Sequence, residues 1–487
     1  MRSLQGRRFD NPLFHGALLA TLLLGAPGCT DGDLTVTFVD VHVTEAGEIT
    51  HRRDLTGLAV NAYVPGGAGR DLTGLEGLVS EEGVLTFVDV PEGEVYVRVS
   101  GEGSDEIIVT SERELDLGVR LLGRPDARKA TVPTPIALDI EGLNPWQGGD
   151  ELRAFALGAG TYGWLYPTSS DTADPGVTSL EASVDASLLL SPGLIEGERG
   201  DRAYLTQLVS HPLGEEPWGY TSIGKVFTPA PFTQVEGETS TWRGSMVDVP
   251  QEELHIDWQR SRFAALAAQV HPAAVGAGHW ASLYADPDGQ RLSESFTPDL
   301  LSIFHMTPDD VSFDLTYGNP FPAGWSVVGD VGATFLVEMP VPDAEATVRV
   351  RGYVSVARQA EAMGTSTLVP EVAPPTGLQI DGRDAQVELR GVGTSPTVSV
   401  VDAGSPGALT YTFMLSRLDV AAAKLETVTV LRSDHPSVSL GIPGLLEEGS
   451  WYHLRVTAQT RSAPVVERKA IPWDGAYAMV LSGFFTP

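Results

Sequence analysis

The sequence predicts a mainly β protein that is built from several domains. Short runs in which apolar and polar residues alternate, as at Leu34 to Asp40 and at Val84 to Val88, are broken by clusters of Gly, Pro and Asp. A length of 487 residues accommodates about two to four domains of typical size. The chain holds one cysteine, so no disulfide can form within it, and buried apolar cores must stabilise each domain.

The N-terminal segment has the parts of an export signal. Arg2, Arg7 and Arg8 precede an uncharged apolar run at residues 13–24, and small residues follow. As a helix this run would span about 18 Å, which is too short for a hydrocarbon core of about 30 Å. We therefore expect residues 1–28 to direct export and then to be removed.

The sole cysteine, Cys29, stands directly after Ala26, Pro27 and Gly28. This segment resembles the lipobox of bacterial lipoproteins, in which the cysteine becomes the lipidated first residue of the mature chain. The resemblance implies a lipid anchor on Cys29, followed by a linker that ends at residue 33. A plain secretory signal with an incidental cysteine is the alternative.

The residue after the cysteine is Thr30. In lipoprotein sorting, an aspartate at that position retains the protein at the inner membrane. By the same resemblance, the chain is expected to be lipid-anchored in the cell envelope, at the outer membrane rather than the inner one.

The chain is strongly acidic, with a formal net charge of −32. Nucleic-acid phosphates and anionic lipid surfaces both require cationic partners, so this charge argues against either as a ligand. It suits a protein that stays soluble outside the cytoplasm.

The first expected domain covers residues 34–125. Its segment from Gly83 to Val99 reads as a strand, a turn with Pro91 and Gly93, and a second strand with Tyr96. This pattern resembles the core hairpin of carboxypeptidase regulatory-like domains, a family of small prealbumin-like sandwiches. The resemblance implies a β-module without catalytic residues.

The central block, residues 126–369, is expected to be a Trp-rich, β-rich domain with at least one helix. It holds seven of the nine tryptophans. Pro250, beside two glutamates, is typical of a first helical turn, and an apolar stripe that includes Leu254 and Trp258 follows until Pro272. We therefore expect a helix at about residues 250–270.

The last block, residues 370–487, resembles a fibronectin type III sandwich. Its clearest match is Leu445 to Ala458, where a leucine, a Gly-x-x-Tyr motif ending at Tyr452 and an alternating strand follow one another. The tryptophan that is usual in the family's second strand is missing here, and Val400 stands near its place. Such domains act as spacers or binding modules, and the fold alone assigns no chemistry.

Three aromatic residues of the central block are candidate ligand-binding residues. Tyr162, Trp164 and Tyr166 alternate, so on a strand they would share one face and could form a platform for sugar rings or a protein partner. Burial in a β core is the alternative interpretation.

Four residues are speculative metal ligands. His271 and His279 are separated by a stretch of Pro, Ala and Gly that could fold back, and Asp286 and Asp288 begin a turn that starts like a calcium loop. Gln290 stands at the next ligand position, so a plain turn is the alternative. No cofactor is predicted; if a metal binds, oxygen ligands favour calcium.

Two motifs are rejected, one typical of nucleotide binding and one typical of a catalytic serine. Residues 219–226 read GYTSIGKV, in which Val226 replaces the hydroxyl that would hold magnesium. Ser222 and Lys225 have the S-x-x-K spacing of penicillin-recognising enzymes, which requires a helix. Gly224 and the β-branched neighbours indicate a strand instead.

The leading hypothesis is a membrane-anchored, non-catalytic lipoprotein that displays a binding module for a protein or glycan ligand. The first alternative is an extracytoplasmic hydrolase with its site in the central block, for which His271, His279 and nearby acidic residues are the nominees. The second is a structural or assembly factor of the envelope. The sequence does not indicate the oligomeric state.

Overall fold

The computed structural model describes residues 32–66, 71–79, 83–101, 104–165, 174–213, 219–289, 296–305, 307–402, 404, 407, 409–460, 465–467, 469 and 474–487. The molecule is mainly β and multidomain, as the sequence predicts. Cys29 and Tyr166 lie outside the described residues. In the described part of the chain, no helix has the length and apolar character that spanning a bilayer requires.

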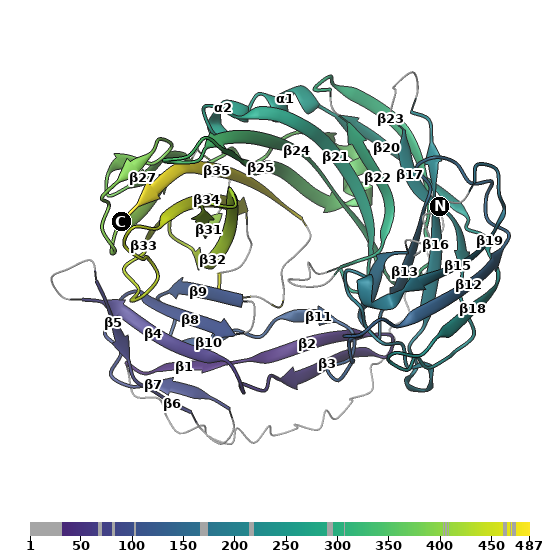
Figure 1. The fold of residues 1–487 in the computed structure, drawn as a ribbon, viewed down its shortest axis with the longest axis horizontal. Helices are drawn as coiled ribbons and strands as arrows, with labels where there is room; N and C mark the ends of the chain where they lie inside the picture. The colour runs from purple at the N-terminus through teal and green to yellow at the C-terminus, as the bar shows by residue number, and fades with distance from the viewer. Residues whose placement is uncertain are drawn as a thin grey trace, which may run out of the picture.

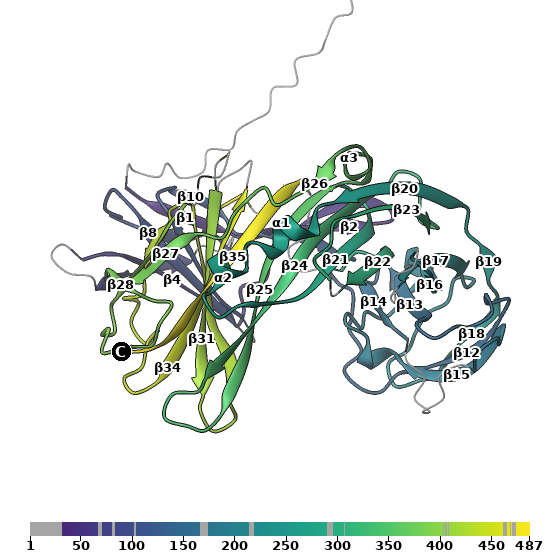
Figure 2. The ribbon, with the colours of Figure 1, turned by 90° about the horizontal axis from the view of Figure 1, so that it is seen from above.

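The elements are arranged around a ring (Figure 1). The N-terminal strands form its lower side, and the chain then passes up the right side, across the top and down to the C-terminal strands on the left. Seen from above, the N- and C-terminal strands lie together at one end of the molecule (Figure 2).

Residues 32–122 form three groups of strands. Two of the groups are separate sheets, one of four strands and one of three, and the third group is part of a longer sheet. The first sheet contains β10 (Glu114–Asp116), β1 (Leu34–Thr37), β7 (Leu85–Phe87) and β6 (Gly77–Val79), the second contains β11 (Arg120–Leu122), β2 (Val39–Thr44) and β3 (Gly47–Arg52), and the third group is β4 (Ala59–Pro65), β5 (Leu72–Leu75), β8 (Val95–Gly101) and β9 (Ser104–Thr110).

The segment from Gly83 to Val99 does not form a hairpin. β7 pairs with β1 and β6, whereas β8 pairs with β4 and β9. The turn at Pro91 therefore carries the chain from one layer to the other, and the apolar side chains of both layers form one core.

Two layers form the next part of the ring. One is a separate sheet with β12 (Pro135–Glu141) at its centre, and a core that includes Trp242 lies between the layers. The first layer also holds β15 (Ser179–Asp185) and β18 (Ser240–Ser245), the second holds β13 (Glu151–Ala156), β14 (Thr161–Trp164), β16 (Ala203–His211), β17 (Tyr220–Phe227) and β19 (Val247–Asp248), and the short helices η1 (Ala186–Leu188) and η2 (Gly197–Arg199) lie between strands.

Long strands and short helices build the top of the ring. The helices α1 and α2 and the small sheet around β20 cover one face of a long sheet. The elements are β20 (Gln251–Trp258), α1 (Arg260–Ala264), α2 (Ala267–Val270), β21 (Val275–Asp286), β22 (Asp299–His305), β23 (Val311–Gly318), β24 (Ser326–Pro340), β25 (Thr347–Gln359), α3 (Ala360–Thr365) and β26 (Thr367–Leu368).

The helix predicted from residue 250 begins ten residues later than expected. Leu254, Ile256 and Trp258 are buried while their neighbours are more exposed, which is the two-residue period of a strand rather than the helical period. The apolar residues at 254 and 258 fit both periods, and the sheet pairing of β20 with β23 decides for the strand. Helical structure is confirmed from Arg260 to Val270, where alanine is frequent.

The C-terminal block is a two-layer sandwich. A four-stranded sheet of β28 (Arg383–Asp384), β27 (Thr376–Ile380), β30 (Thr397–Val401) and β33 (Ser437–Ser439) packs on the strands β29 (Leu389–Arg390), β31 (Leu409–Asp419), β32 (Lys424–Ser433), β34 (Trp451–Thr460) and β35 (Gly475–Thr486).

One hydrogen-bonded sheet connects all of these regions. Its pairings run from β14 through β13, β16, β17, β22, β21, β24, β25, β35, β34, β31, β32, β9, β8 and β4 to β5. The division into domains at residues 125 and 370 stays a prediction, because this sheet continues across both positions.

The N-terminal strands close the ring through two junctions of different character. At the apolar junction, β9 pairs in parallel with β32, and Ile107 and Val109 are fully buried in the core that contains Leu431. At the polar junction, Arg124 donates to both carboxylate oxygens of Asp201 over 3.0 and 2.9 Å.

Candidate ligand-binding site

A row of small polar side chains crosses five neighbouring strands of the long sheet. Each member lies directly opposite the next, so all of them share one face. The members of this polar row are Ser210 of β16, Thr221 of β17, Ser302 of β22, Ser282 of β21 and Asp330 of β24.

The opposite face of these strands is apolar. Ala281, Leu283, Leu301 and Ile303 alternate with the polar row and are buried in the main core. Because strand side chains alternate between faces, the burial of this set turns the polar row away from the core.

Aromatic side chains flank the polar row. Phe304 lies directly opposite Trp280 on the same face, and 54% of Phe304 is exposed. Trp280 lies over Gly332, where a Cβ would approach its ring to 2.5 Å, and meets Tyr353 edge to face at 5.9 Å. An exposed phenyl ring beside hydroxyl groups is a typical composition of a small-molecule site.

Hydrogen bonds fix the Asp330 end of the row. The indole of Trp280 donates to one carboxylate oxygen of Asp330 over 3.0 Å, and the hydroxyl of Tyr284 donates to the other over 3.2 Å. Burial raises the pKa of Tyr284 well above its ordinary value, so this phenol stays a donor.

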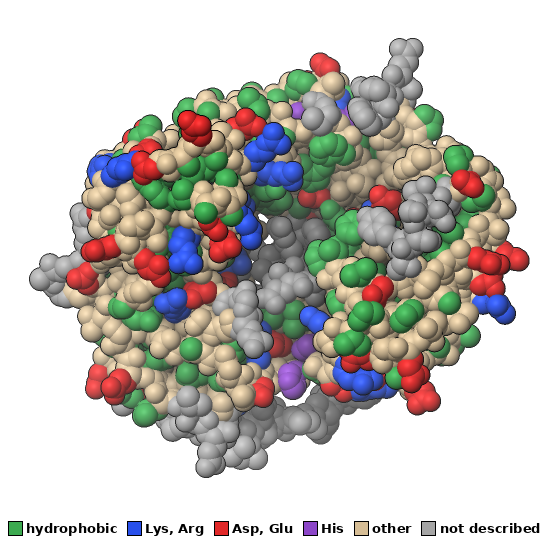
Figure 3. Space-filling model, in the orientation of Figure 1, with side chains coloured by type: hydrophobic (Ala, Val, Ile, Leu, Met, Phe, Trp, Pro, Cys, Tyr) green, Lys and Arg blue, Asp and Glu red, His purple; other side chains and the backbone are tan. Residues whose placement is uncertain are grey.

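A cavity of about 960 Å³ opens at the other end of the row. Its volume lies within the range of small-molecule sites. The lining combines backbone, polar and aromatic groups, from Gln147, Gly148, Gly149, Glu151, Ser210, His211, Pro212, Gly219, Tyr220, Thr221, Ser302 and Phe304. The space-filling view shows the hollow centre of the ring, with hydrophobic side chains gathered on its right-hand wall (Figure 3).

The predicted aromatic residue Trp164 lies beside this cavity. Its indole donates to Glu151 over 2.8 Å, and the Arg153 guanidinium lies 5.0 Å from the centre of its ring. Glu151, which lines the cavity, also accepts from Arg153 over 2.7 Å. The carboxylate therefore links Trp164 to the cavity wall.

The predicted residue Tyr162 is buried, and its hydroxyl is engaged. It donates to Asp299, which also accepts from Arg153. Burial raises the pKa of Asp299, although the Arg153 guanidinium opposes the shift. Tyr162 and Trp164 share one face, with ring centres 6.1 Å apart, and Phe296 stacks on Tyr162. Tyr162 is therefore packed and hydrogen-bonded rather than presented to solvent.

A serine and a histidine lie in contact beside the cavity. The Ser222 hydroxyl and Nε2 of His211 are 2.9 Å apart. Ser222 is completely buried, and a nucleophile requires access to the substrate carbonyl. Lys225, expected on a strand, lies on β17 and pairs with Asp248 over 2.8 Å. The Ser222–His211 contact joins β17 to the end of β16, and the Lys225–Asp248 pair joins β17 to β19.

The structure does not bring the four speculative metal ligands together. His271 lies at the end of α2, where burial lowers its pKa and the charge of Asp384 partly opposes the shift. His279 lies on β21 beside Trp258, Arg260 and His305. Burial lowers the pKa of His279 to about 4.

Asp286 is the last residue of β21, roughly 23 Å along the strand from His279, and Asp288 follows in the next turn. Asp288 accepts from Arg120, and burial raises the pKa of Asp286 to about 7. Across the described ranges, no three acidic, histidine or cysteine side chains are placed to hold a metal ion.

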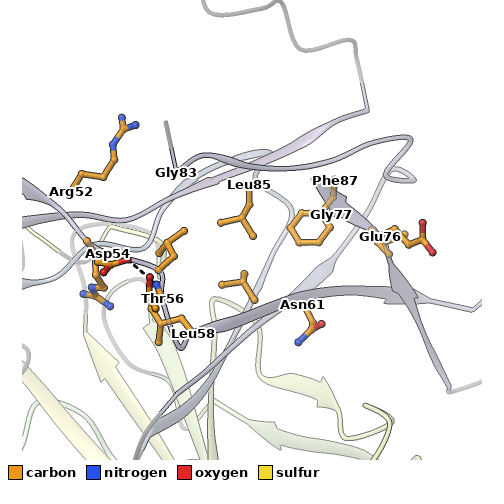
Figure 4. A pocket seen from close by; sticks show the side chains of 14 residues that line it. Arg52, Asp54, Thr56, Leu58, Asn61, Glu76, Gly77, Gly83, Leu85 and Phe87 are labelled. Atoms are coloured by element: carbon orange, nitrogen blue, oxygen red, sulfur yellow. Dashed lines mark hydrogen bonds between the residues drawn. The ribbon is translucent and has the colours of Figure 1, made fainter. Parts of the chain in front are cut away.

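A second open cavity, of about 1020 Å³, lies between the layers of the N-terminal strands. Leu85 and Phe87 form its apolar floor, while Arg52, Asp54 and Glu76 lie at its rim (Figure 4). Gly77 is required at its wall, because a Cβ there would approach the Phe87 ring to 2.6 Å. The rim carries charges of both signs, so it selects for neither anions nor cations.

No family model matches the chain, and no curated protein matches it. One similar solved structure is the crystal structure of Dscam1 isoform 8.4, N-terminal four Ig domains, at 12% identity over 92% of this chain and 98% of that one. The TM-score of 0.11 is too low for this likeness to carry an argument. The class that the structure defines is therefore a mainly β, multidomain protein without an identified family.

Proposed function

We propose that the chain is a non-catalytic binding protein of the cell envelope, anchored by lipid on Cys29, that holds a glycan along the polar row. The observation that carries the proposal is the combination of in-register hydroxyl groups, an exposed phenyl ring and a cavity on one face of one sheet. Hydroxyl and carboxylate groups suit the hydroxyl groups of a sugar, and aromatic faces suit its apolar side.

The C-terminal block supports a display role as a fibronectin type III-like spacer. The Tyr452 hydroxyl, near the start of β34, accepts a hydrogen bond from the backbone N–H of Glu447 over 2.8 Å. A tyrosine that bonds to the backbone a few residues upstream is a feature of immunoglobulin-like sandwiches.

Intrinsic fluorescence tests the glycan proposal, because Trp280 lies directly opposite Phe304. We expect one member of a panel of chito-, cello-, malto- and mannotetraose to change the tryptophan emission of the full chain. Phe304→Ala is expected to raise the Kd obtained from that titration about tenfold, which corresponds to about 1.4 kcal/mol of binding free energy.

Two further variants define the site. Thr221→Val removes a hydroxyl from the polar row at constant shape and is expected to weaken binding. Leu78→Ala is the control, because Leu78 is 67% exposed on β6 and lies outside the lining of this cavity. Equal losses for Leu78→Ala and Phe304→Ala, or binding of unglycosylated peptides in place of the sugars, would contradict the proposal.

A further inference from the structure

Two arginines of the long sheet, Arg351 on β25 and Arg455 on β34, have no carboxylate partner among the described residues. Two residues from Arg351, the side chain of Arg349 contacts Glu338 over 3.0 Å. The chain has 64 acidic residues and 32 basic ones, so acidic partners are abundant in general. Figure 3 shows Lys and Arg side chains at the upper left rim of the hollow centre. This part of the sheet therefore offers positive charge to a ligand.

Arg351 lies on the same face of the sheet as the polar row. On β25, Arg351, Tyr353 and Ala357 are separated by even numbers of residues, and Ala357 lies directly opposite Asp330. Because strand side chains alternate between faces, these positions share one face. Tyr353 meets Trp280 edge to face at 5.9 Å, so aromatic rings lie between the polar row and Arg351.

Arg455 also points to this face. Leu454 and Val456, its neighbours on β34, are fully buried in the main core, so the side chain of Arg455 is turned to the opposite side. Arg455 lies opposite Leu481 of β35, the strand that lies between β34 and β25. The phenol of Tyr353 is close enough to act on the charge of Arg455. Both arginines are therefore neighbours of Tyr353.

The guanidinium of Arg455 is not compensated within the described part of the chain. Its Nε is buried and has no hydrogen-bond partner there. Burial lowers the pKa of Arg455, but an arginine stays charged at neutral pH. The nearby His453 supplies no negative charge, since burial lowers its pKa to about 3 and keeps it neutral. A charge that leaves water without a partner costs stability, so a negatively charged ligand would be favourable at this position.

We propose that Arg455 and Arg351 bind the carboxylate of an acidic glycan whose neutral part lies along the polar row. A guanidinium forms two parallel hydrogen bonds with a carboxylate, and the rings of Tyr353 and Trp280 suit the apolar sides of sugars. Asp330, which would repel an acid, lies about 20 Å from Arg351 along the strand direction. The glycan part of this inference rests on the proposed function, whereas the anion site does not.

The anion site is tested with a single acidic sugar. Urea unfolding of the full chain is measured with glucuronate or with glucose at matched ionic strength. A ligand that binds only the folded chain raises the unfolding midpoint, so we expect glucuronate to raise it and glucose to have a much smaller effect. Arg455→Met is expected to lose the glucuronate effect. Without ligand this variant should be no less stable than the unsubstituted chain, because it removes a buried charge that has no partner.

The glycan part is tested with a matched pair of oligosaccharides. The pair consists of the neutral tetraose that changes the tryptophan emission and the same sugar with its terminal primary hydroxyl group oxidised to a carboxylate. We expect the acidic form to bind at least about tenfold more tightly. Arg351→Met, at an exposed position where folding is not at stake, is expected to reduce this preference as well.

A control variant and the outcomes separate the two proposals. Arg417→Met removes an arginine that pairs with Glu447 over 3.1 Å and should keep both responses. A glucuronate effect that is absent, or that persists in Arg455→Met, would overturn the anion site. Equal affinities for the neutral and the acidic tetraose would overturn the acidic glycan and leave the proposed function in place. A glucuronate effect without binding of any tetraose would support the anion site and contradict the proposed function.

Discussion

The two junctions that close the ring use opposite kinds of interaction. The apolar junction extends one sheet through β9 and β32 and buries Ile107, while its ion pair of Arg432 with Glu106 is partly exposed. The polar junction depends on arginines, since Arg124 meets Asp201, and Arg120 meets Asp288. The side chain of Asp201, the partner of Arg124, is only 1% exposed. The first junction therefore gains mainly from the burial of apolar side chains, whereas the second is stable only while each buried charge keeps its partner.

The largest expected effect is at the polar junction. Arg124→Met leaves the Asp201 carboxylate buried without its bidentate partner, which costs about 3–5 kcal/mol of unfolding free energy. Urea unfolding followed by circular dichroism measures this change. Arg128→Ala, which removes an exposed partner of Glu196, is the control and should change stability by less than about 1 kcal/mol. Similar losses for both variants would refute the contrast.

A smaller loss is expected at the apolar junction. Ile107→Ala creates a cavity between β9 and the C-terminal core, at a cost of about 3 kcal/mol. The same urea experiment, repeated at low and high salt, should give an unchanged difference, because the substituted side chain carries no charge. A strongly salt-dependent loss would contradict the apolar role of Ile107.

Near the polar junction, stability should fall as the pH rises. Burial raises the pKa of Asp286 from 3.8 to about 7, so between these values the folded chain holds a proton that the unfolded chain releases. The contribution of this carboxyl is complete below pH 4 and is lost as the pH rises through 7, by at most about 1.4 kcal/mol per pH unit. Asp286→Asn should flatten this part of the stability profile, and a profile identical to that of the unsubstituted chain would contradict the shift.

In the C-terminal sandwich, the sign is reversed. Burial lowers the pKa of His453 from 6.5 to about 3, so the unfolded chain binds the additional proton. The contribution of neutral His453 is complete above pH 6.5 and is lost as the pH falls toward 3. His453→Gln should reduce acid sensitivity in this window, as measured by the unfolding midpoint between pH 4 and 7; unchanged acid sensitivity would argue against a buried neutral histidine.

Sequence patterns were sufficient for the fold class but not for the site. Alternation at Leu34 to Phe38 predicts strands because local backbone geometry imposes a two-residue period. Around residue 254 the pattern is ambiguous, because the apolar residues at 254 and 258 fit both the two-residue period of a strand and the period of a helix. The helix was therefore expected too early.

The polar row could not be predicted from local pattern. Ser210, Thr221, Ser282, Ser302 and Asp330 lie on five strands, and only the register of those strands brings them together. A single serine in a strand carries no periodic signal. Of the predicted aromatic residues, Trp164 donates to Glu151 of the cavity wall, and Tyr162 is buried; that they take part in binding stays a prediction.

The pairing of β9 with β32 also sets the order in which the protein can fold. Thr429 donates to Asp105 across 324 residues of chain, so this contact cannot form until almost the entire polypeptide is available. Contacts between distant segments are formed slowly, because a long loop must close first. Until then, β9 presents an unpaired strand edge that is prone to aggregation. A chain built in this way depends on protection during synthesis, until its final hundred residues have arrived.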